Sequence, residues 1–156
     1  MPQNKQIAIP TEDAMDKFGE ALALQLKPGD TILLTGVIGA GKTHLCRAII
    51  RSIVGKSEEV PSPTYTIVQT YQGPKAEIWH ADLYRLSDSS ELVELGLDEA
   101  METAIVLIEW PDRLHKSMRP TDALEITIMP KGEGRIVDLS SGATRWKPFL
   151  SAFADA

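Results

Sequence analysis

Residues 36–43 fit the pattern G-x-x-x-x-G-K-[ST], a glycine-rich turn that closes with a lysine and a hydroxyl residue. The run Thr31–Thr35 before it is typical of a buried strand, and a helical stretch follows it. In such a strand–loop–helix unit the glycines let backbone N–H groups turn inward on phosphate oxygens. We therefore expect an α/β fold that binds nucleotide phosphates between this strand and this helix.

The residues of the loop have distinct expected roles. Lys42 is expected to reach the β- and γ-phosphate oxygens of ATP, and the Thr43 hydroxyl is expected to bind Mg²⁺. His44 is expected near the phosphates, and we assign it no catalytic role. The expected nucleotide contacts in this segment are Gly36, Gly39, Ala40, Gly41, Lys42, Thr43 and His44.

The length of 156 residues suits one well-buried core and is short for a phosphate-binding domain plus a second substrate domain. We expect residues 1–156 to form a single domain. No apolar run approaches the roughly 18 residues of a membrane span, and residues 1–6 lack the apolar core of a signal peptide. The lone Cys46 cannot form an internal disulfide, and we interpret it as a core residue rather than a nucleophile. These features predict a cytoplasmic protein with no membrane partner.

The formal net charge of −6 argues against direct binding to a nucleic-acid backbone, which requires clustered Lys and Arg to displace counterions. One local basic cluster occurs beyond the middle of the chain, and a solvated helix surface is the simpler interpretation of it. Its members are Arg113, His115, Lys116 and Arg119. Any role that involves nucleic acid is therefore expected to be indirect.

Helical and strand patterns alternate through the first third of the chain. Residues 6–9 are typical of a short strand, and a helix is expected to begin just after Thr11. Residues 27–30 are expected to end this helix, and Gly55 is expected to end the helix after the phosphate-binding loop. The apolar stripe of the first helix, which we expect to face the core, consists of Met15, Phe18, Leu22 and Leu26.

A hairpin is expected where the extended runs 65–71 and 76–86 flank the turn-like segment 72–75. A hairpin is antiparallel, whereas strands that alternate with helices are parallel. The predicted fold class is therefore α/β, a P-loop NTPase domain with a mixed, mostly parallel central sheet flanked by helices. The other expected elements are a short helix through 91–95, strands at 104–108, 123–129 and 135–140, a short helix from Pro111 and a closing helix from Trp146.

Two carboxylates are candidates for holding Mg²⁺ and orienting water beside the phosphates. Glu109 follows four apolar residues, as expected for a buried strand that delivers an acid at its C-terminal edge. Asp82 lies in an alternating run, 79–84, that puts His80 and Asp82 on one polar face. A solvent-facing strand gives the same alternation, so the pattern alone leaves the role of Asp82 open. His80 is a candidate hydrogen-bond partner on that face.

The turn at residues 62–66 follows the helix after the phosphate-binding loop. Many P-loop proteins carry a segment at this place that senses the γ-phosphate of the nucleotide. Two prolines beside hydroxyl residues are equally typical of a rigid turn.

Five short motifs occur in order over nearly the whole chain: Gly-Ala-Gly-Lys-Thr at 39–43, Ser-Pro-Thr-Tyr-Thr at 62–66, His-Ala-Asp-Leu-Tyr-Arg-Leu at 80–86, Glu-Leu-Gly-Leu at 94–97 and Ile-Glu-Trp-Pro at 108–111. Together they closely resemble the TsaE family, formerly called YjeE. This family is the ATPase component of the bacterial machinery that makes threonylcarbamoyladenosine at position 37 of tRNAs that read codons beginning with A.

The resemblance implies a P-loop ATPase that docks on the TsaD–TsaB heterodimer and meets tRNA only indirectly, through that complex. The resemblance further implies that TsaD transfers the threonylcarbamoyl group and that ATP hydrolysis by this chain resets the complex between turnovers. By matching motifs, Lys42, Asp82 and Glu109 form the implied catalytic set. Thr43 and Glu109 become Mg²⁺ ligands, and Asp82 belongs to the metal shell or orients water.

The resemblance also implies weaker assignments. Trp110 becomes a structural or partner-sensitive neighbour of the site, and Thr11 lies near the base or ribose. A nucleotide contact from Lys131 or Arg135 is implied less strongly still. The chain departs from the family at Val37, where an acidic residue is usual, and at His44, where a hydroxyl residue is usual. We expect these departures to affect the fine control of hydrolysis rather than phosphate binding.

Three alternatives share the phosphate-binding loop. A small-molecule kinase would use a carboxylate such as Asp82 as a base toward a substrate hydroxyl. A GTPase is disfavoured because no N-K-x-D motif, which reads guanine, occurs in the sequence. A nucleotide-gated binding module would bind ATP without turning it over, even with partners present.

Overall fold

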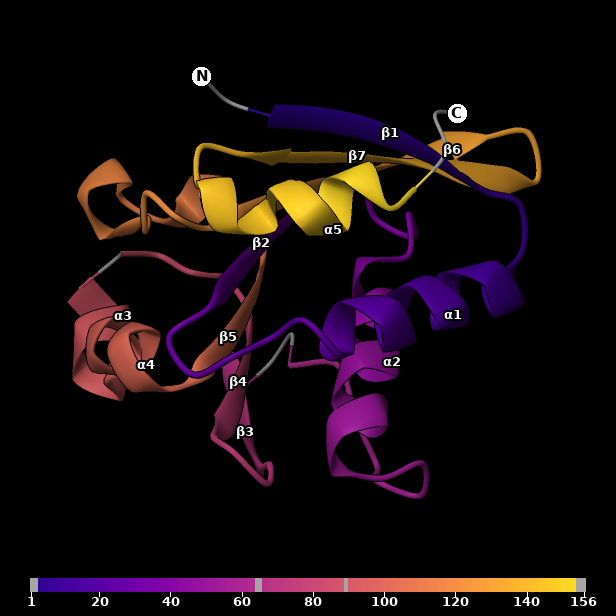
Figure 1. Ribbon diagram of the computed structural model, residues 1–156. Helices are drawn as coiled ribbons and strands as arrows, with labels where there is room; N and C mark the ends of the chain where they lie inside the picture. Colours follow the sequence, from indigo (N-terminus) through magenta and orange to yellow (C-terminus); the bar gives the residue numbers. More distant parts are fainter. Residues whose placement is uncertain (1–2, 64–65, 89, 154–156) are drawn as a thin grey trace.

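Strand β2 (Thr31–Thr35), which leads into the phosphate-binding loop, lies at the centre of a seven-stranded sheet (Figure 1). The strand order is β1-β7-β6-β2-β5-β4-β3 in the computed structural model, which describes residues 3–63, 66–88 and 90–153. The other strands are β1 (Gln3–Ile9), β3 (Val68–Gln72), β4 (Glu77–Asp82), β5 (Ile105–Glu109), β6 (Leu124–Lys131) and β7 (Gly134–Ser141).

The centre of the sheet is parallel and its margins are antiparallel. β2 pairs in parallel with β5 on one side and with β6 on the other, and β4 runs parallel to β5. The pairs β1–β7, β6–β7 and β3–β4 are antiparallel. The predicted mixed sheet and the hairpin that joins β3 to β4 are therefore confirmed. Because β2, β5 and β4 are parallel, their carboxyl ends meet at one edge of the sheet.

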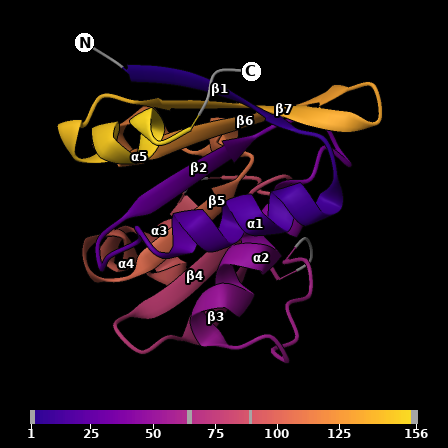
Figure 2. The ribbon, with the colours of Figure 1, turned by 45° about the vertical axis from the view of Figure 1, so that its right-hand side comes forward.

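Helices cover both faces of the sheet (Figure 2). The helices α1 (Glu12–Ala23), α2 (Lys42–Val54) and α5 (Lys147–Ser151) pack on one face, and α3 (Ser90–Leu95) and α4 (Leu97–Thr103) pack on the other. Short 3₁₀ helices follow β5 and β7: η1 (Pro111–Arg113), η2 (Lys116–Met118) and η3 (Thr144–Trp146). Within the described residues, no helix combines the length and the apolar character that crossing a bilayer requires.

The predicted apolar stripe of α1 faces the core, and each of its four members is buried. α1 and α2 lie against one another at close range: a Cβ added to Gly19 would stand 2.7 Å from the Cβ of Ala48. Glycine at position 19 therefore lets the helix that carries the phosphate-binding loop pack tightly on α1.

The first helix is shorter than the stripe suggests, because α1 ends at Ala23 whereas Leu26 lies beyond it. After α1 the hydrogen bonds span three residues, as in a 3₁₀ helix. The Gln25 N–H donates to the Leu22 carbonyl, and the Leu26 N–H donates to the Ala23 carbonyl. This tighter turn still brings Leu26 into the core, at 6% exposure. The apolar spacing therefore indicated which residues are buried, and overestimated how far the α-helix extends.

The second extended run also ends early, at Asp82 rather than at residue 86. The Leu83 N–H bonds to the Glu109 carbonyl, and the chain then turns away from the sheet. The helix α4 was not predicted, since the sequence indicated only one short helix, through 91–95, in this region. In the structure Gly96 has φ +85° and both ends α3 and starts α4.

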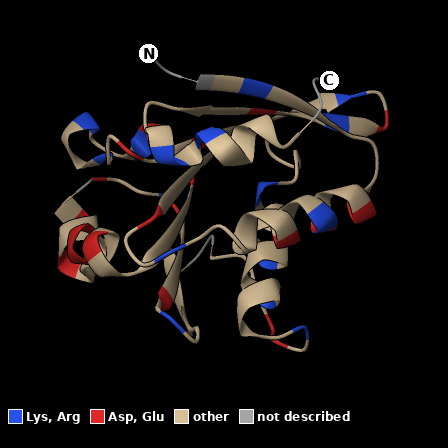
Figure 3. Ribbon diagram, viewed as in Figure 1, with Lys and Arg blue, Asp and Glu red and all other residues tan. Residues whose placement is uncertain are grey.

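Acidic residues gather on α3 and α4 (Figure 3). The basic cluster near η1 and η2 is mostly exposed, and its most buried member, Arg119, donates to the Pro111 carbonyl at 2.8 Å. A solvated surface is consistent with this arrangement. The acidic residues on α3 and α4 are Glu91, Glu94, Asp98, Glu99 and Glu102.

A buried carboxylate, Asp30, joins the start of β2 to the end of the chain. Asp30 Oδ1 accepts from Arg145 Nε at 3.0 Å, and Oδ2 accepts from Arg145 Nη2 and, at 2.7 Å, from the Lys27 N–H. The Arg145 guanidinium also stacks on Trp146, with its carbon 3.9 Å from the ring centroid. This cluster fixes η3 against the start of β2, the strand that precedes the phosphate-binding loop.

We predict that Arg145→Ala lowers the free energy of unfolding by about 2 kcal/mol, because Asp30 then loses its charged hydrogen-bond donor in a nearly buried position. Urea denaturation followed by far-ultraviolet circular dichroism measures this change. Lys147→Ala, which removes an exposed side chain two positions further on, is the control and should change stability by less than about 0.5 kcal/mol. Equal stability of the two variants would contradict the prediction.

Candidate functional site

The phosphate-binding loop connects β2 to the first turn of α2. Gly39 and Gly41 have φ values of +81° and +115°, in the left-handed region that favours glycine. A Cβ added to Gly39 would meet nothing within 4 Å, so the backbone conformation rather than packing requires glycine there. The loop leads into a 13-residue helix whose N-terminal N–H groups are oriented toward it, as anion binding requires.

Lys42 folds back over this loop. Its Nζ donates to the Gly36 carbonyl at 2.6 Å and to the Val37 carbonyl at 3.0 Å, and it lies 4.3 Å from the centroid of the Trp110 ring. Burial lowers the pKa of Lys42, while the carboxylates of Glu109 and Asp82 act in the opposite direction. The ammonium thus lies among loop carbonyls and an aromatic face, at the mouth of the predicted phosphate site.

The side chains of Glu109 and Thr43 are joined by hydrogen bonds. The Thr43 hydroxyl donates to Glu109 Oε1 and Oε2, at 2.9 and 3.1 Å. Glu109 is the last residue of β5, which delivers it at the C-terminal edge of the sheet as predicted. Asp82 ends the neighbouring parallel strand and is the register partner of Glu109. The sheet therefore brings both candidate carboxylates to the loop, and they are buried, at 5% and 2% exposure.

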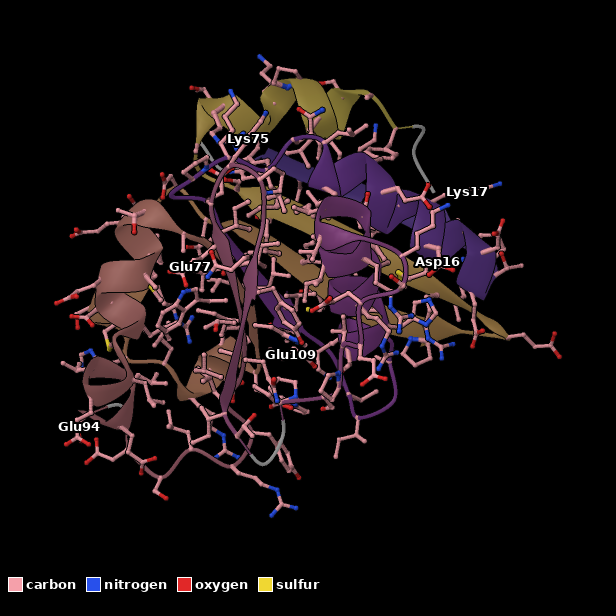
Figure 4. All side chains as sticks on the ribbon, turned by 90° about the horizontal axis from the view of Figure 1, so that it is seen from below. Asp16, Lys17, Lys75, Glu77, Glu94 and Glu109 are labelled. Atoms are coloured by element: carbon pink, nitrogen blue, oxygen red, sulfur yellow. The ribbon has the colours of Figure 1, made fainter. Side chains whose placement is uncertain are left out.

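These residues line one pocket of about 370 Å³. Its wall also includes Tyr84 and Trp110, whose ring centroids are 4.9 Å apart, and Arg85. Trp110 has φ +59°, a left-handed conformation for a residue with a side chain. In Figure 4, Glu109 is in the interior of the molecule, whereas Glu94 of α3 lies at the periphery. The predicted site residues in this pocket are Gly39, Gly41, Lys42, Thr43, His44, Asp82 and Glu109.

Gly39 and Gly41 line two pockets, and the smaller of these two, of about 230 Å³, lies on the other side of the loop. Thr11 lines it and caps α1, accepting the Ala14 N–H at 3.1 Å. Arg135 of β7 lines it too, and donates to the Ala40 carbonyl at 2.8 Å and to the Gly39 carbonyl at 3.3 Å. Lys131 is absent from its lining. Of the weaker assignments, the fold brings Thr11 and Arg135 to the loop.

His44 lies at the edge of both pockets, and its side chain is engaged with α1. Its Nε2 is 2.7 Å from Oδ1 of Asp16, a residue labelled in Figure 4. The pair links the first turn of α2 to α1. Sequence reasoning could not find this contact, because no local pattern joins residues 28 positions apart.

His80 is the hydrogen-bond partner that the polar face of β4 suggested, and that face is buried rather than solvated. His80 is fully buried, with Nε2 2.6 Å from Glu109 Oε2. The alternation along β4 indicated the orientation of His80 and Asp82 correctly. It could not indicate that α2 covers this face, since a solvent-facing strand has the same pattern.

The turn at 62–66 is only partly described, because Thr64 and Tyr65 lie outside the described residues. Ser62 lines the larger pocket. Ile67 has φ +68°, and its N–H donates to the Pro63 carbonyl at 2.7 Å. The chain turns at Thr66 and Ile67 before β3, which begins at Val68 rather than near residue 65 as predicted.

The donor set of the larger pocket fits magnesium and phosphate. Thr43, Asp82 and Glu109 present a hydroxyl and two carboxylates, the oxygen ligands that Mg²⁺ prefers. The glycine loop and Lys42 supply N–H and ammonium donors suited to phosphate oxygens. The arrangement is capable of holding a nucleoside triphosphate with its metal ion and placing a carboxylate beside the terminal phosphate.

Comparisons with known proteins agree with one another. The family model "Threonylcarbamoyl adenosine biosynthesis protein TsaE" matches residues 9–137. The chain is 40% identical over 125 residues to the tRNA threonylcarbamoyladenosine biosynthesis protein TsaE of Rickettsia bellii, covering 80% of this chain and 86% of that one. It is 35% identical over 153 residues to the protein of the same name from Haemophilus influenzae, covering 94% and 96%. The crystal structure of YdiB from Bacillus subtilis has the same fold, with a TM-score of 0.79 at 23% identity over 97% of this chain and 95% of that one.

Cys46 of α2 is fully buried beside the site, and burial, with Glu109 and Asp82 nearby, raises the pKa of its thiol well above the ordinary value. We predict that the native chain barely reacts with a chromogenic disulfide reagent and that unfolding in guanidinium exposes one reactive thiol. Ser52→Cys places a second thiol at an exposed position of the same helix and should label rapidly in the native state. Rapid labelling of the native wild-type chain would contradict the burial of Cys46.

Proposed function

Because the chain belongs to the TsaE family, we propose that it is an ATP-binding and ATP-hydrolysing component of the machinery that makes N6-threonylcarbamoyladenosine at position 37 of tRNA. The membership agrees with the resemblance predicted from the five motifs. On this proposal residues 1–156 form one ATPase domain that works in the cytoplasm, where tRNA is modified.

One observation supports the ATPase proposal most directly. Thr43 of the phosphate-binding loop donates to Glu109 at the end of the adjacent parallel strand, within a single pocket that also contains Lys42. A hydroxyl bonded to a buried carboxylate keeps its oxygen lone pairs available for a metal ion. A glycine turn without a catalytic role would not need a buried acid at this place.

Each residue of the pocket has a proposed part in binding or hydrolysis. Lys42 would exchange its bonds to the Gly36 and Val37 carbonyls for bonds to phosphate oxygens. Thr43 and Glu109 would hold Mg²⁺, which would neutralise phosphate charge when bound. Asp82 would orient the attacking water, and its Oδ1 accepts the Tyr84 N–H at 3.0 Å, which fixes the carboxylate.

The smaller pocket is the proposed place for the nucleoside part of ATP. Thr11 and Arg135 lie there beside the loop, and Gly39 and Gly41 line it together with His44. Arg135 already donates to two loop carbonyls, so its proposed contribution is to hold the loop as well as to contact the nucleotide.

The proposed protein partner is the TsaD–TsaB heterodimer, and tRNA is reached only through that complex. The acidic surfaces of α3 and α4 and the net charge of −6 make the chain a poor ligand for a nucleic-acid backbone (Figure 3). The exposed apolar side chains of Val37 and Ile38, on the phosphate-binding loop, are available to such a partner.

We predict that Lys42→Ala abolishes most nucleotide binding, whereas Asp82→Ala and Glu109→Ala mainly reduce turnover, by on the order of 10²-fold. Titration with a fluorescent ATP analogue measures binding, and phosphate release measures hydrolysis. Glu125→Ala, which removes an exposed carboxylate on β6 outside both pockets, is the matched control and should leave both unchanged. Unchanged turnover in both pocket variants would contradict the assigned roles.

The cellular function is tested by hydrolysis with and without TsaD–TsaB and unmodified tRNA. We expect the complex to stimulate ATP turnover and Asp82→Ala to abolish the stimulation. An ATP turnover rate that TsaD–TsaB does not change, together with ATP-dependent phosphorylation of a metabolite, would instead support a small-molecule kinase. Tight ATP binding without turnover under every condition would support a nucleotide-gated binding module.

A further inference from the structure

A fully buried histidine lies directly behind the proposed metal site. His80 on β4 is 0% exposed, and its Nε2 is 2.6 Å from Glu109 Oε2. Glu109 and Thr43 line the larger pocket, whereas His80 does not. The histidine therefore reaches the pocket only through the carboxylate of Glu109.

The direction of this hydrogen bond follows from the chemistry of the two groups. A carboxylate oxygen only accepts, so the His80 Nε2 carries the hydrogen and donates it to Glu109. In the described ranges, 3–63, 66–88 and 90–153, His80 Nδ1 is buried and has no hydrogen-bond partner. The imidazole is therefore buried with only one of its two nitrogens hydrogen-bonded, which costs desolvation free energy. Leu or Ile at this position would be buried without that free-energy cost.

The bond places Glu109 between two donors. Its Oε2 accepts from His80 on one side, and both of its oxygens accept from the Thr43 hydroxyl on the other. The three side chains come from three elements, β4, β5 and α2, which the rest of the fold holds in register. The Thr43 hydroxyl and His80 Nε2 therefore both donate to the Glu109 carboxylate, from opposite sides.

A closed metal site is the competing interpretation, because Cys46 Sγ also lies within 4.8 Å of ligand atoms of His80 and Glu109. A tetrahedral zinc ion with ligand bonds near 2.0–2.1 Å keeps its nitrogen and oxygen ligands about 3.3 Å apart. The observed 2.6 Å between His80 Nε2 and Glu109 Oε2 is a hydrogen-bond distance. The geometry favours a direct bond over a shared metal.

We propose that His80 is a positioning residue: its hydrogen bond fixes the Glu109 carboxylate, the Thr43 hydroxyl donates to that carboxylate, and the lone pairs of the Thr43 oxygen would then be available to Mg²⁺. This inference rests on the proposed function, since it assumes that Thr43 and Glu109 bind the metal ion of a nucleotide. Partners behind a metal ligand typically change metal affinity or activity 10–100-fold when they are removed.

A matched pair of substitutions separates the hydrogen bond from simple packing. His80→Gln places an amide nitrogen close to the position of Nε2, within reach of Glu109. His80→Asn buries the same amide group, and its nitrogen stops near the position of Nδ1, out of reach. Ile78→Ala, at a fully buried residue two positions earlier on β4 that points to the same face, is the control for loss of packing alone.

The measurement is binding of a fluorescent ADP analogue to the full-length chain at increasing Mg²⁺, with EDTA for the metal-free affinity. We expect His80→Asn to raise the Mg²⁺ concentration for half-maximal effect by about 10-fold or more, with metal-free affinity unchanged. His80→Gln should restore most of the wild-type response. Ile78→Ala should lower the melting temperature without changing the Mg²⁺ response.

Different outcomes contradict different statements. An unchanged Mg²⁺ response in His80→Asn, or equal loss in the Asn and Gln variants, would overturn the positioning role. So would a matching loss in Ile78→Ala. Failure of the wild-type chain to bind the analogue at any Mg²⁺ concentration would overturn the proposed function itself. Because the readout is binding, a wild-type chain that binds without hydrolysing still decides the role of His80.

Discussion

Parallel pairing of β2 with β5, and of β5 with β4, is the constraint on which the pocket rests. It brings the carboxyl ends of three strands to one edge, so that the phosphate-binding loop, Glu109 and Asp82 meet although they are distant in sequence. The hydrogen bond from Thr43 to Glu109 then joins the loop to the sheet. The remaining contacts of the site add to this arrangement. Lys42 Nζ lies over the Trp110 ring, and Arg135 donates to the loop carbonyls. His80 bonds to Glu109 from the interior.

Hydrogen bonds explain how two carboxylates and a histidine are tolerated in the buried space beneath α2. Glu109 accepts hydrogen bonds from Thr43 and His80, and Asp82 accepts the Tyr84 N–H. Each acid is thus paired with donors before any ligand arrives, which limits the cost of removing it from water. Lys42 is likewise held by loop carbonyls and an aromatic face. The pocket is organised in advance around oxygen and nitrogen atoms suited to a phosphate and its metal ion.

The sequence predicted best what depends on neighbouring residues. The loop, β2 and β5 follow from short patterns of glycine and buried aliphatic residues, and Glu109 follows from its place at the end of such a run. The burial of His80 and Asp82 depends on what covers β4, and the strand pattern carries no information about that. The contacts of Arg135 with Ala40, and of His44 with Asp16, join segments 95 and 28 residues apart and leave no local signature. The extra helix α4 was missed because Gly96 ends one helix and starts another.

The strand order has a consequence for how the chain acquires its shape during synthesis. Both sheet neighbours of β2 lie far downstream, since β5 begins at Ile105 and β6 at Leu124. Until residues 105–131 have been made, β2 lacks both of the strands that pair with it in the folded sheet. The pocket forms from long-range contacts, which close slowly compared with local ones. A nucleotide therefore meets a complete pocket only after β5 and β6 have joined β2 in the sheet.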